Sequence, residues 1–513
     1  MKYHKILVCS ALVAATLPLV NGQAATPPVA RELPSAQPLP LSGREPTGAV
    51  ITIETPQTGA GANSVNTLNP SIQIQGAYQG STPVGTAAAE PLALTLEDAI
   101  KRGIQYNLGS IGASQAVRQA RAQRLLAGAQ LLPDVAGGLR ETVQQIDLAT
   151  IGLHPNIPIP GFSFPTIVGP FNYFDLRASF TQSFSMTGLR SWRSSQENTR
   201  SSELSFKDAR QVVTLAVAGS YLQLLASAAR IDTARAQIET AQTVYRQAVD
   251  RNLSGLNARI DVNRSLVELQ TEQQRLTSIL NDFEKQKLAL ARLIGLPMAQ
   301  RFTLSDTIPY RELPAPNLDD LIQRAFSGRA DVQAAATQVK AAELAKKAAT
   351  SEYYPSLDVA ADYGVTGVNP SQSHGTFLAT AAVNFPIFRS GRIRASIEQA
   401  DAALAQRRAE YEDIKAQAEQ DVRNAALDAE AASAQVRVAE SNRKLAADTL
   451  TQARDRFRAG VADTVELVQA QESVATAEQD YINAVFAFNL AQVSLARAMG
   501  QTEQGIALLL QGK

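Results

Sequence analysis

Residues 392–460 read RIRASIEQADAALAQRRAEYEDIKAQAEQDVRNAALDAEAASAQVRVAESNRKLAADTLTQARDRFRAG, and no other part of the chain constrains the structure as strongly. This stretch has no proline, and its first glycine is Gly460, so nothing in it interrupts a helix. Residues 189–254 have a similar composition, with no proline and one glycine, Gly219. At 1.5 Å per residue, each helix would be about 100 Å long, far beyond the usual length of about 11–12 residues.

Each long helix is followed by a second proline-free stretch, which ends near Gly295 in one case and near Gly500 in the other. Glycine is the residue that most often closes a helix, so Gly255 and Gly460 predict turns between antiparallel partners. We therefore expect two long helical hairpins with coiled-coil packing. Small side chains allow close approach of the helices, and in the second hairpin they include Ala425, Ala426, Ala429, Ala432 and Ala439.

The two hairpins belong to a duplicated unit. Pro133 and Pro355 are 222 residues apart, and the same spacing separates Leu96 from Leu318 and Asp98 from Asp320. The later halves align at a spacing of 205, with 12 identities in the 49 columns that start at Gln247. In each copy a shorter alanine-rich helix, which opens near residue 95 or 318 and stops at the proline, precedes the long hairpin.

Between the short and long helices lie segments that alternate apolar and polar residues. These segments are 135–143, 176–184, 357–365 and 377–385. Strands of about ten residues with this alternation are what a membrane barrel requires, with lipid outside and water inside. The alternative is a set of half-buried strands in a soluble sheet. Four strands cannot close a barrel, and open edges are not tolerated in lipid, so a membrane-spanning chain must oligomerise; three copies would supply twelve strands.

The N-terminus predicts export. Lys2 and Lys5 precede an apolar run over residues 6–20, followed by small residues, the layout of a secretory signal peptide. The only cysteine, Cys9, lies within that run, and the apolar run is too short to span a bilayer as a helix. We find no later apolar run long enough for a transmembrane helix. Residues 26–91 are rich in proline, so we expect a mostly extended segment there.

Composition excludes several functions. Lys and Arg number 48, as do Asp and Glu, so the chain lacks the basic surplus of a nucleic-acid-binding protein. Three histidines and one cysteine argue against a His/Cys zinc site. We find no Ser–His–Asp order and no phosphate-binding glycine loop, so we expect no catalytic, cofactor or metal site and no enzyme activity.

The ordered, duplicated motifs resemble those of the TolC-like outer-membrane factors, the outer membrane efflux proteins. The segments that carry the resemblance are Leu94–Ala99, Leu132-Pro133, Tyr354-Pro355 and Phe385–Arg392, together with the turns Arg251–Val262 and Arg456–Leu467. The resemblance covers residues 94–500. It implies a mainly α protein with β-strands: long coiled-coil hairpins in two repeats, and four strands that contribute to a trimeric, twelve-stranded transmembrane barrel.

The resemblance also implies a function. It describes a passive outer-membrane channel of a tripartite efflux or type I secretion system. Such a channel is a homotrimer in outer-membrane lipid, with a tunnel in the periplasm of a Gram-negative-type envelope. Its partners are a periplasmic adaptor (membrane fusion protein) and an inner-membrane pump. By position, adaptor contacts at the helix tips fall on Arg251, Gly255, Leu256, Arg456, Gly460 and Val461.

A periplasmic gate is a further implication of the resemblance. The family's acidic rings follow the second turn, where this chain has Glu466 but Gln469 in place of the second acid. Asp261 is the corresponding acid in the first repeat. Three copies of Glu466 near one axis would favour cations. The alternative is that Glu466 is an ordinary solvent-exposed glutamate on a helix, with no role in a gate.

The resulting domain organisation has six parts. They are a signal peptide (1–25), a Pro-rich extended segment (26–93), repeat 1 (94–300), a linker (301–317), repeat 2 (318–500) and a C-terminal tail (501–513). Three rival interpretations remain open at this point: an exported periplasmic adaptor, a soluble exported coiled-coil or structural protein, and an exported hydrolase. A single hairpin between β-rich halves would favour the adaptor, and this chain has two hairpins.

Overall fold

The computed structural model describes residues 50–57, 67–150, 152, 166–255, 258–306 and 317–503. The predicted signal peptide, most of the C-terminal tail and Leu256 therefore lie outside the described residues. The chain divides into two compact units, a sheet unit and a helical unit. Residues 128–189 and 351–390 form the sheet unit, and the helical unit holds the rest of both repeats.

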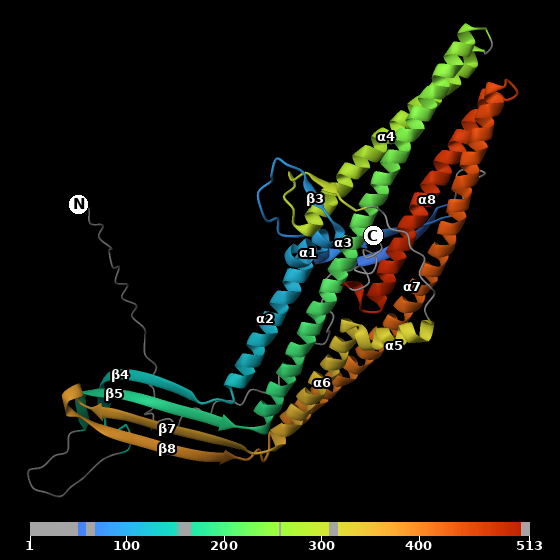
Figure 1. The fold of residues 1–513 in the computed structure, drawn as a ribbon. Coiled ribbons are helices and arrows are strands. Elements are labelled where there is room, and N and C mark those ends of the chain that lie inside the picture. The colour runs from blue at the N-terminus through green and yellow to red at the C-terminus, as the bar shows by residue number, and fades with distance from the viewer. Residues whose placement is uncertain are drawn as a thin grey trace, which may run out of the picture. The chain divides into compact units, whose positions relative to one another are not determined.

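The helical unit contains the two predicted hairpins. In the first, α3 (Met186–Leu253) is followed by α4 (Arg259–Ile294); in the second, α7 (Arg392–Arg458) is followed by α8 (Thr464–Ala498). The hairpins lie side by side, with all four helices nearly aligned (Figure 1). Absence of proline and near absence of glycine explain why α3 and α7 continue for 68 and 67 residues. The sequence prediction of two long antiparallel hairpins is confirmed.

The shorter helices differ from the prediction of one continuous helix in each repeat. Repeat 1 has α1 (Leu96–Tyr106) and α2 (Leu108–Ala129). Repeat 2 has α5 (Leu318–Gly328) and α6 (Ala330–Thr350). The single residues between them, Asn107 and Arg329, are 222 apart and adopt an extended backbone in both repeats. The expectation of unbroken helices was therefore wrong.

Buried polar side chains explain these breaks. The Asn107 amide donates to the Tyr78 carbonyl (2.8 Å), and its Oδ1 accepts from the Gly109 N–H (2.9 Å). In repeat 2, the Arg329 guanidinium binds Asp331 (2.7 Å) and Asp421 (2.8 Å). Each side chain thereby satisfies polar groups that would be costly to bury without partners. Local helix propensity could not predict this, because one partner of each break, Tyr78 or Asp421, comes from another segment.

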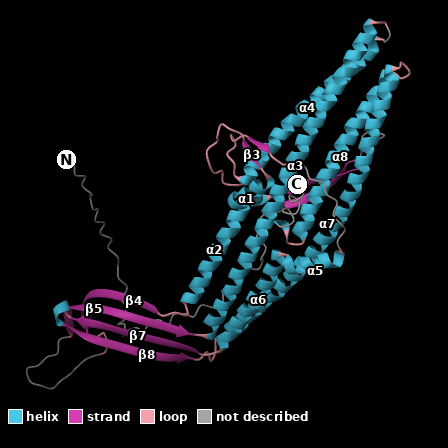
Figure 2. Ribbon diagram, in the orientation of Figure 1, coloured by secondary structure: helices cyan, strands magenta, loops and turns pink. Residues whose placement is uncertain are grey.

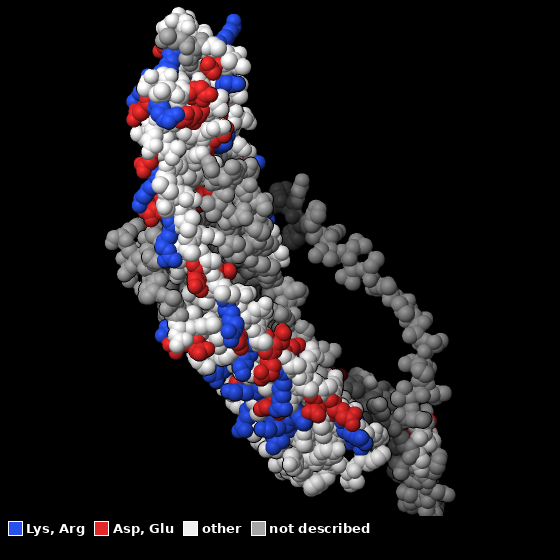
Figure 3. All heavy atoms as spheres, turned by 90° about the vertical axis from the view of Figure 1, so that its right-hand side faces the viewer, with Lys and Arg blue, Asp and Glu red and all other residues white. Residues whose placement is uncertain are grey.

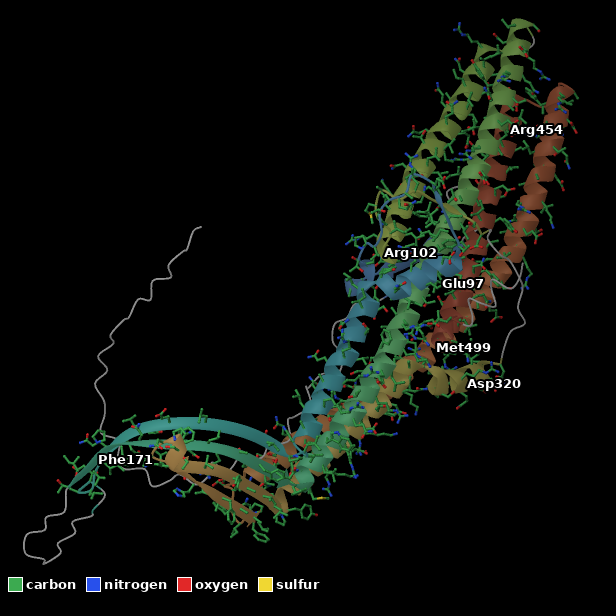
Figure 4. The ribbon with its side chains drawn as sticks, turned by 60° about the vertical axis from the view of Figure 1, so that its left-hand side comes forward. Glu97, Arg102, Phe171, Asp320, Arg454 and Met499 are labelled. Atoms are coloured by element: carbon green, nitrogen blue, oxygen red, sulfur yellow. The ribbon has the colours of Figure 1, made fainter. Side chains whose placement is uncertain are left out.

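A glycine closes the return helix of each repeat and packs against the break. Gly295 and Gly500 have φ values of +72° and +74°. A Cβ at Gly295 would lie 2.7 Å from the Cβ of Tyr106, and one at Gly500 would lie 2.7 Å from the carbonyl carbon of Gly328. Both positions therefore need glycine for conformation and for space. Figure 4 shows the neighbouring Met499 at the end of α8 beside α5.

An ion pair with exchanged charges also marks the duplication. In repeat 1, Arg121 on α2 binds Glu203 on α3 at 2.7 Å. In repeat 2, Glu343 on α6 binds Arg408 on α7 at 2.8 Å. The offsets between these residues are 222 and 205, the spacings found in the sequence. The two repeats thus keep the same helix contact with the acid and the base exchanged.

The described part of the Pro-rich lead contains regular secondary structure. It contains an antiparallel pair, β1 (Val50–Gln57) with β2 (Thr67–Ile74), and β2 contacts α8. A short strand, β3 (Leu92–Leu94), pairs in parallel with β6 (Phe302–Leu304). Short 3₁₀ turns occur at Gly76–Gln79, Ser351–Tyr353 and Pro370–Gln372. Part of the lead is therefore integrated with the helical unit.

The core of the helical unit lies where α3 meets α1, α4 and α8. Tyr221 on α3 is fully buried, and its hydroxyl donates to the Leu94 carbonyl (2.9 Å) and to Asp306 (3.0 Å). Contrary to the sequence prediction, α3 contains an 18-residue window apolar enough to cross a bilayer. That window is 72% buried, so its apolar character is explained by packing inside the protein.

The sheet unit holds four antiparallel strands in the order β4–β5–β7–β8 (Figure 2). Their bounds are β4 (Asp134–Asp147), β5 (Ile167–Phe184), β7 (Ser356–Gly367) and β8 (Ser373–Asn384). The four predicted strands are all present and extend beyond the predicted segments at most ends. β4 and β8 are the two outer strands, so each has one edge that no described strand pairs.

Strand register places one kind of side chain on each face of the sheet. Phe180 pairs with Val135 on one side and Ala361 on the other, and Ala361 pairs with Ala379. The apolar face defined by this register comprises Val135, Leu139, Val143, Phe174, Leu176, Ala178, Phe180, Phe184, Leu357, Val359, Ala361, Tyr363, Val365, Phe377, Ala379, Ala381 and Val383. Glu141 and Gln182 are polar exceptions on the same face.

Candidate functional site

Two regions carry features that a compact soluble core does not explain: the exposed sheet face and the helix tips. On the apolar face, Val135 is 69% exposed, Tyr363 66% and Phe377 79%. The opposite face holds polar side chains, among which Arg177 contacts Asp362, Asp175 (3.3 Å) and Thr376 (3.4 Å). The sheet thus has one face suited to an apolar environment and one suited to water.

The second tip, between α7 and α8, is closed by a Schellman turn. Gly460 has φ +76°, its N–H donates to Phe457 (3.1 Å), and the Val461 N–H donates to Arg456 (3.0 Å). The Asp463 side chain then caps α8 by accepting from the Glu466 N–H at 2.9 Å. The predicted contact residue Val461 is 71% exposed. This tip presents an apolar side chain on a hydrogen-bonded turn.

The first tip, between α3 and α4, is closed by Gly255. Gly255 has φ +73°, and its N–H donates to the Asn252 carbonyl at 3.0 Å. The predicted acid Asp261 lies in the first turn of α4, where its carboxylate is 3.7 Å from Arg264. A carboxylate in that position also interacts favourably with the helix dipole. Asp261 is therefore held by its own helix.

Arg251 joins the two tips. Its guanidinium donates to the Phe457 carbonyl at 2.7 Å, and its central carbon lies 4.1 Å from the centroid of the Phe457 ring. Phe457 is only 2% exposed, so this contact is sheltered from water. Sequence reasoning selected Arg251 but missed Phe457. The sequence did offer a signal for Phe457, because it is an apolar residue between the two charged residues Arg456 and Arg458.

Glu466, the predicted gate residue, is paired within its own chain. Its Oε1 lies 3.0 Å from Arg456 Nε, and about 43% of its side chain is exposed. The structure thus pairs the predicted gate residue Glu466 with the predicted contact residue Arg456. The other predicted gate residue, Asp261, pairs with Arg264, which was not predicted as a site residue. Pairing with Arg456 reduces the negative charge that Glu466 presents.

Three carboxylates interact where α4 faces α8: Glu268 and Glu272 on α4 and Glu472 on α8. Glu272 is 5% exposed at its side chain, with Oε1 bound to Arg275 at 2.7 Å. Its Oε2 has no hydrogen-bond partner among the described residues. Burial raises the pKa of the Glu272 carboxyl, Arg275 opposes this shift, and the charge of Glu472 adds to it. Burial likewise raises the pKa of Glu268, with Glu272 and Glu472 contributing.

The charged surface shows no field of a single sign on the side seen in Figure 3, where acidic and basic residues alternate along the helices. Among the described residues, no group of three or more His, Cys, Asp or Glu side chains could hold a metal ion. The features that remain are the two-faced sheet with open edges and the linked helix tips.

Comparison with known proteins shows which family combines such a two-faced sheet with long helical hairpins. The family described as Outer membrane efflux protein matches residues 112–296 and 321–501. The chain belongs to the outer membrane efflux protein family. The two matched segments correspond to the two repeats, and they cover most of the chain. Like its relatives, this family member is an outer-membrane component of an efflux system in a Gram-negative-type envelope.

Individual relatives agree with the family. The pyoverdine export outer membrane protein OpmQ of Pseudomonas putida KT2440 is 27% identical over 410 residues, covering 78% of this chain and 84% of that protein. The toluene efflux pump outer membrane protein TtgC of Pseudomonas putida is 24% identical, covering 62% of this chain and 65% of that protein. The Campylobacter jejuni CmeC outer membrane channel has the same fold, with a TM-score of 0.70 at 15% identity, covering 81% of this chain and 89% of the channel chain.

Proposed function

We propose that this family member is a passive trimeric conduit from the periplasm to the cell exterior. The observation that carries the proposal is the four-stranded sheet, whose apolar face is exposed and whose outer strands β4 and β8 each leave one edge that no described strand pairs. Such edges cannot remain open in lipid. Three copies joined edge to edge would form a closed barrel of twelve strands, with lipid against the apolar face and water within.

The helical unit supports a tunnel built from the hairpins of several copies. Exposed apolar side chains lie along α4 and α7, the helices on the outer sides of the two hairpins in Figure 1. They are Val267, Leu280 and Leu288 on α4 and Leu427, Val438 and Leu445 on α7. Lateral association of three copies would cover these side chains and surround the axis with twelve helices. Leaving them in water would cost hydrophobic stabilisation.

The helix tips are the proposed docking site for a periplasmic adaptor, which in turn recruits an inner-membrane pump. Arg251, Gly255, Arg456, Gly460 and Val461 form or flank the two turns; Leu256 is proposed by position alone. Hydrogen-bonded glycine turns with an exposed valine suit recognition by an apolar helix tip of a partner. Energy for export would come from the pump, because the sequence carries no phosphate-binding glycine loop through which the chain could use a nucleotide.

We propose the same tips as the periplasmic gate. Arg251 holds the C-terminus of α7 from α3, so separating the hairpins requires breaking a sheltered 2.7 Å hydrogen bond. Glu466 and Asp261 would present carboxylates near the axis of a trimer. If so, Glu466→Gln should lower cation selectivity in single-channel recordings, and unchanged reversal potentials would remove Glu466 from the gate.

The exported substrate is not specified by these features. OpmQ is named for pyoverdine export, while TtgC is named for toluene efflux. Such different cargoes among relatives suggest that the shared conduit accepts many compounds and that the pump selects them. The adaptor alternative is disfavoured, because the family match covers both hairpins and the strands between them.

The conduit can be tested with the full-length protein purified from outer membranes. Native mass spectrometry in detergent should give a trimer, and planar lipid bilayers should show discrete conductance steps after insertion. A water-soluble monomer that does not insert would contradict the proposal. Substitution of Val461 by aspartate should reduce adaptor cross-linking in cells while leaving the trimer mass unchanged, which separates docking from assembly.

A further inference from the structure

Arg230 carries a positive charge that the helical unit encloses without compensating it. It lies on α3, one turn beyond Ala226, which is fully buried in the core that α3 forms with α8. The residue as a whole is half-buried, but its Nε atom is shut off from water and has no hydrogen-bond partner among the described residues. Burial lowers the pKa of the guanidinium below its ordinary value, yet an arginine keeps its charge in a protein.

Three other arginines that the helical unit encloses each bind a carboxylate. They are Arg329 with Asp331 (2.7 Å), Arg407 with Glu410 (2.8 Å) and Arg497 with Asp208 (2.5 Å). Arg230 forms no ion pair within the described part of the chain, and no charged group there shifts its pKa. Because a charge removed from water is costly without an opposite charge nearby, a negative charge is missing at Arg230.

The side chain that faces Arg230 from α8 is neutral. Arg230 Nη2 donates to Oδ1 of Asn483 at 2.6 Å, and Gln479 Nε2 donates to the same oxygen at 3.1 Å. Asn483 is only 5% exposed. An amide oxygen has two lone pairs, and these two donors occupy both. The Nε–H of Arg230 therefore needs an acceptor from outside the described chain.

A water molecule would meet only part of this need. Buried water commonly bridges polar groups and could accept from Nε, but it brings no net charge. The guanidinium would still be enclosed without compensation. An anion accepts the hydrogen bond and compensates the charge together, and hydrogen bonds between charged groups are the stronger ones.

Repeat 2 shows that the long helices can pack without this arginine. The residue 205 positions after Arg230 is Gln435 on α7, whose Oε1 is likewise enclosed and without a hydrogen-bond partner among the described residues. One repeat thus holds a neutral amide where the other holds a cation. The uncompensated charge is a property of repeat 1 alone, so helix packing does not account for it.

We infer that Arg230 binds a small monovalent anion, of the size and charge of chloride, between α3 and α8. Nε of Arg230 donates to the anion, and the guanidinium remains anchored to Asn483. The neighbours of these two residues in sequence, Ile231 and Ile482, are 6% and 7% exposed, so the surroundings are closely packed and suit a small ion. The site lies within one chain and is separate from the proposed conduit and its tips.

Thermal unfolding of the purified full-length protein tests the anion site. Sodium gluconate, whose anion is bulky, is replaced stepwise by sodium chloride at constant ionic strength, so that screening of surface charges stays the same. The melting temperature of the natural protein should rise with chloride and level off less steeply once the site is filled, because a ligand bound only to the folded state stabilises it. No response to chloride would overturn the inference.

Two substitutions on α3 provide the matched comparison. Arg230→Gln places the residue of repeat 2 at the equivalent position of repeat 1, and its melting temperature should no longer depend on chloride. Arg246→Gln removes the same charge from an exposed position of the same helix and should respond to chloride as the natural protein does. A chloride response that persists in Arg230→Gln would show that the ion binds elsewhere.

A third variant supplies the missing charge from the protein itself. Asn483→Asp places a carboxylate at the oxygen that lies 2.6 Å from Arg230, with almost no change of shape. It should raise the melting temperature in gluconate and remove the dependence on chloride. A variant that is no more stable in gluconate than the natural protein, or that still responds to chloride, would contradict an uncompensated charge at Arg230.

Bromide locates the ion directly, because it scatters X-rays anomalously. Crystals of the natural protein soaked in sodium bromide should show an anomalous peak within about 3.5 Å of Arg230 Nε, and crystals of Arg230→Gln should show none there. A water molecule at Nε, or a carboxylate of a neighbouring copy bound to the guanidinium, would overturn the anion site. Trimer mass and conductance, measured on the same protein, test the conduit separately.

Discussion

At the level of single residues, Arg251 shows how a side chain can link segments about 200 positions apart. The guanidinium is stacked on Phe457 and donates to the carbonyls of Phe457 and Arg458 at the end of α7, where unsatisfied carbonyl groups carry partial negative charge. A lysine could not provide the same planar contact. The tip contact therefore depends on the identity of the residue as well as on its charge.

Replacing Arg251 should loosen the tips. Arg251→Ala removes the bond to Phe457 and its cation–π contact, so we expect a loss of about 1–2 kcal/mol in local stability. Limited proteolysis should then cleave the tips faster. Arg454→Ala is the matched control, because Arg454 lies on α7 near the same tip (Figure 4). Similar cleavage rates for both variants would contradict the linking role.

Glu272 predicts a dependence of stability on pH. Because its pKa is raised above the ordinary value of 4.5, its contribution to stability is full below pH 4.5 and is lost as pH rises through the folded-state pKa. Glu272→Gln keeps an acceptor for Arg275 and removes the buried charge. It should stabilise the protein by about 1 kcal/mol at pH 7 and have little effect at pH 4.

Thermal unfolding at the two pH values checks this prediction. Glu284→Gln is the control, because the Glu284 side chain lies on the same helix and is 66% exposed. It should leave the melting temperature nearly unchanged at both pH values. A Glu272→Gln variant that is less stable than the natural protein at pH 7 would show that the carboxylate is favourable where it lies.

At the level of elements, glycines with the same backbone conformation have different roles. Gly460 and Gly500 have φ values of +76° and +74°, yet a Cβ at Gly460 would meet nothing within 4 Å. A Cβ at Gly500 would collide with the backbone of Gly328. The first glycine serves a turn, while the second also allows α8 to approach the break between α5 and α6.

Alanine substitutions should separate these two roles. Gly460→Ala incurs only the cost of the left-handed conformation, about 1 kcal/mol. Gly500→Ala adds a clash with backbone atoms, so we expect about 2–4 kcal/mol and a clearly lower melting temperature. Differential scanning calorimetry of the two purified variants compares them directly, and equal melting temperatures would refute the packing role of Gly500.

At the level of the whole molecule, the two faces of the sheet should respond oppositely to charge. Ala361 lies on the apolar face beside Phe180, whereas its neighbour Ala360 lies on the polar face beside Thr181. Arginine on a lipid-facing position near mid-membrane costs about 2–4 kcal/mol. Ala361→Arg should therefore reduce the amount of assembled protein in the outer membrane, and Ala360→Arg should be tolerated.

Quantitative blots of outer-membrane fractions measure that difference. Both variants add the same charge at adjacent positions of β7, so translation and export affect them equally. If Ala360→Arg lost as much assembled protein as Ala361→Arg, the apolar face would not be the one in contact with lipid.

Some features of the site were predictable and others were not. Gly255 and Gly460 could be assigned to the tips because each is a glycine that interrupts a long stretch free of proline, which is a local property. The partners of the tip residues could not be assigned. Phe457 meets Arg251, and Glu466 meets Arg456, only once the hairpins are packed and the turns have formed.

The sequence alone determined the long helices, the hairpins and the two faces of each strand, because absence of helix breakers and alternation with a period of two act within a few residues of the chain. Packing determined the breaks at Asn107 and Arg329, the hairpin in the Pro-rich lead and the link between the tips. Each of these features has at least one partner remote in sequence: Tyr78 and Asp421 at the breaks, α8 beside the lead hairpin, and Phe457 at the tips. Their hydrogen bonds and contacts exist only when distant segments are brought together.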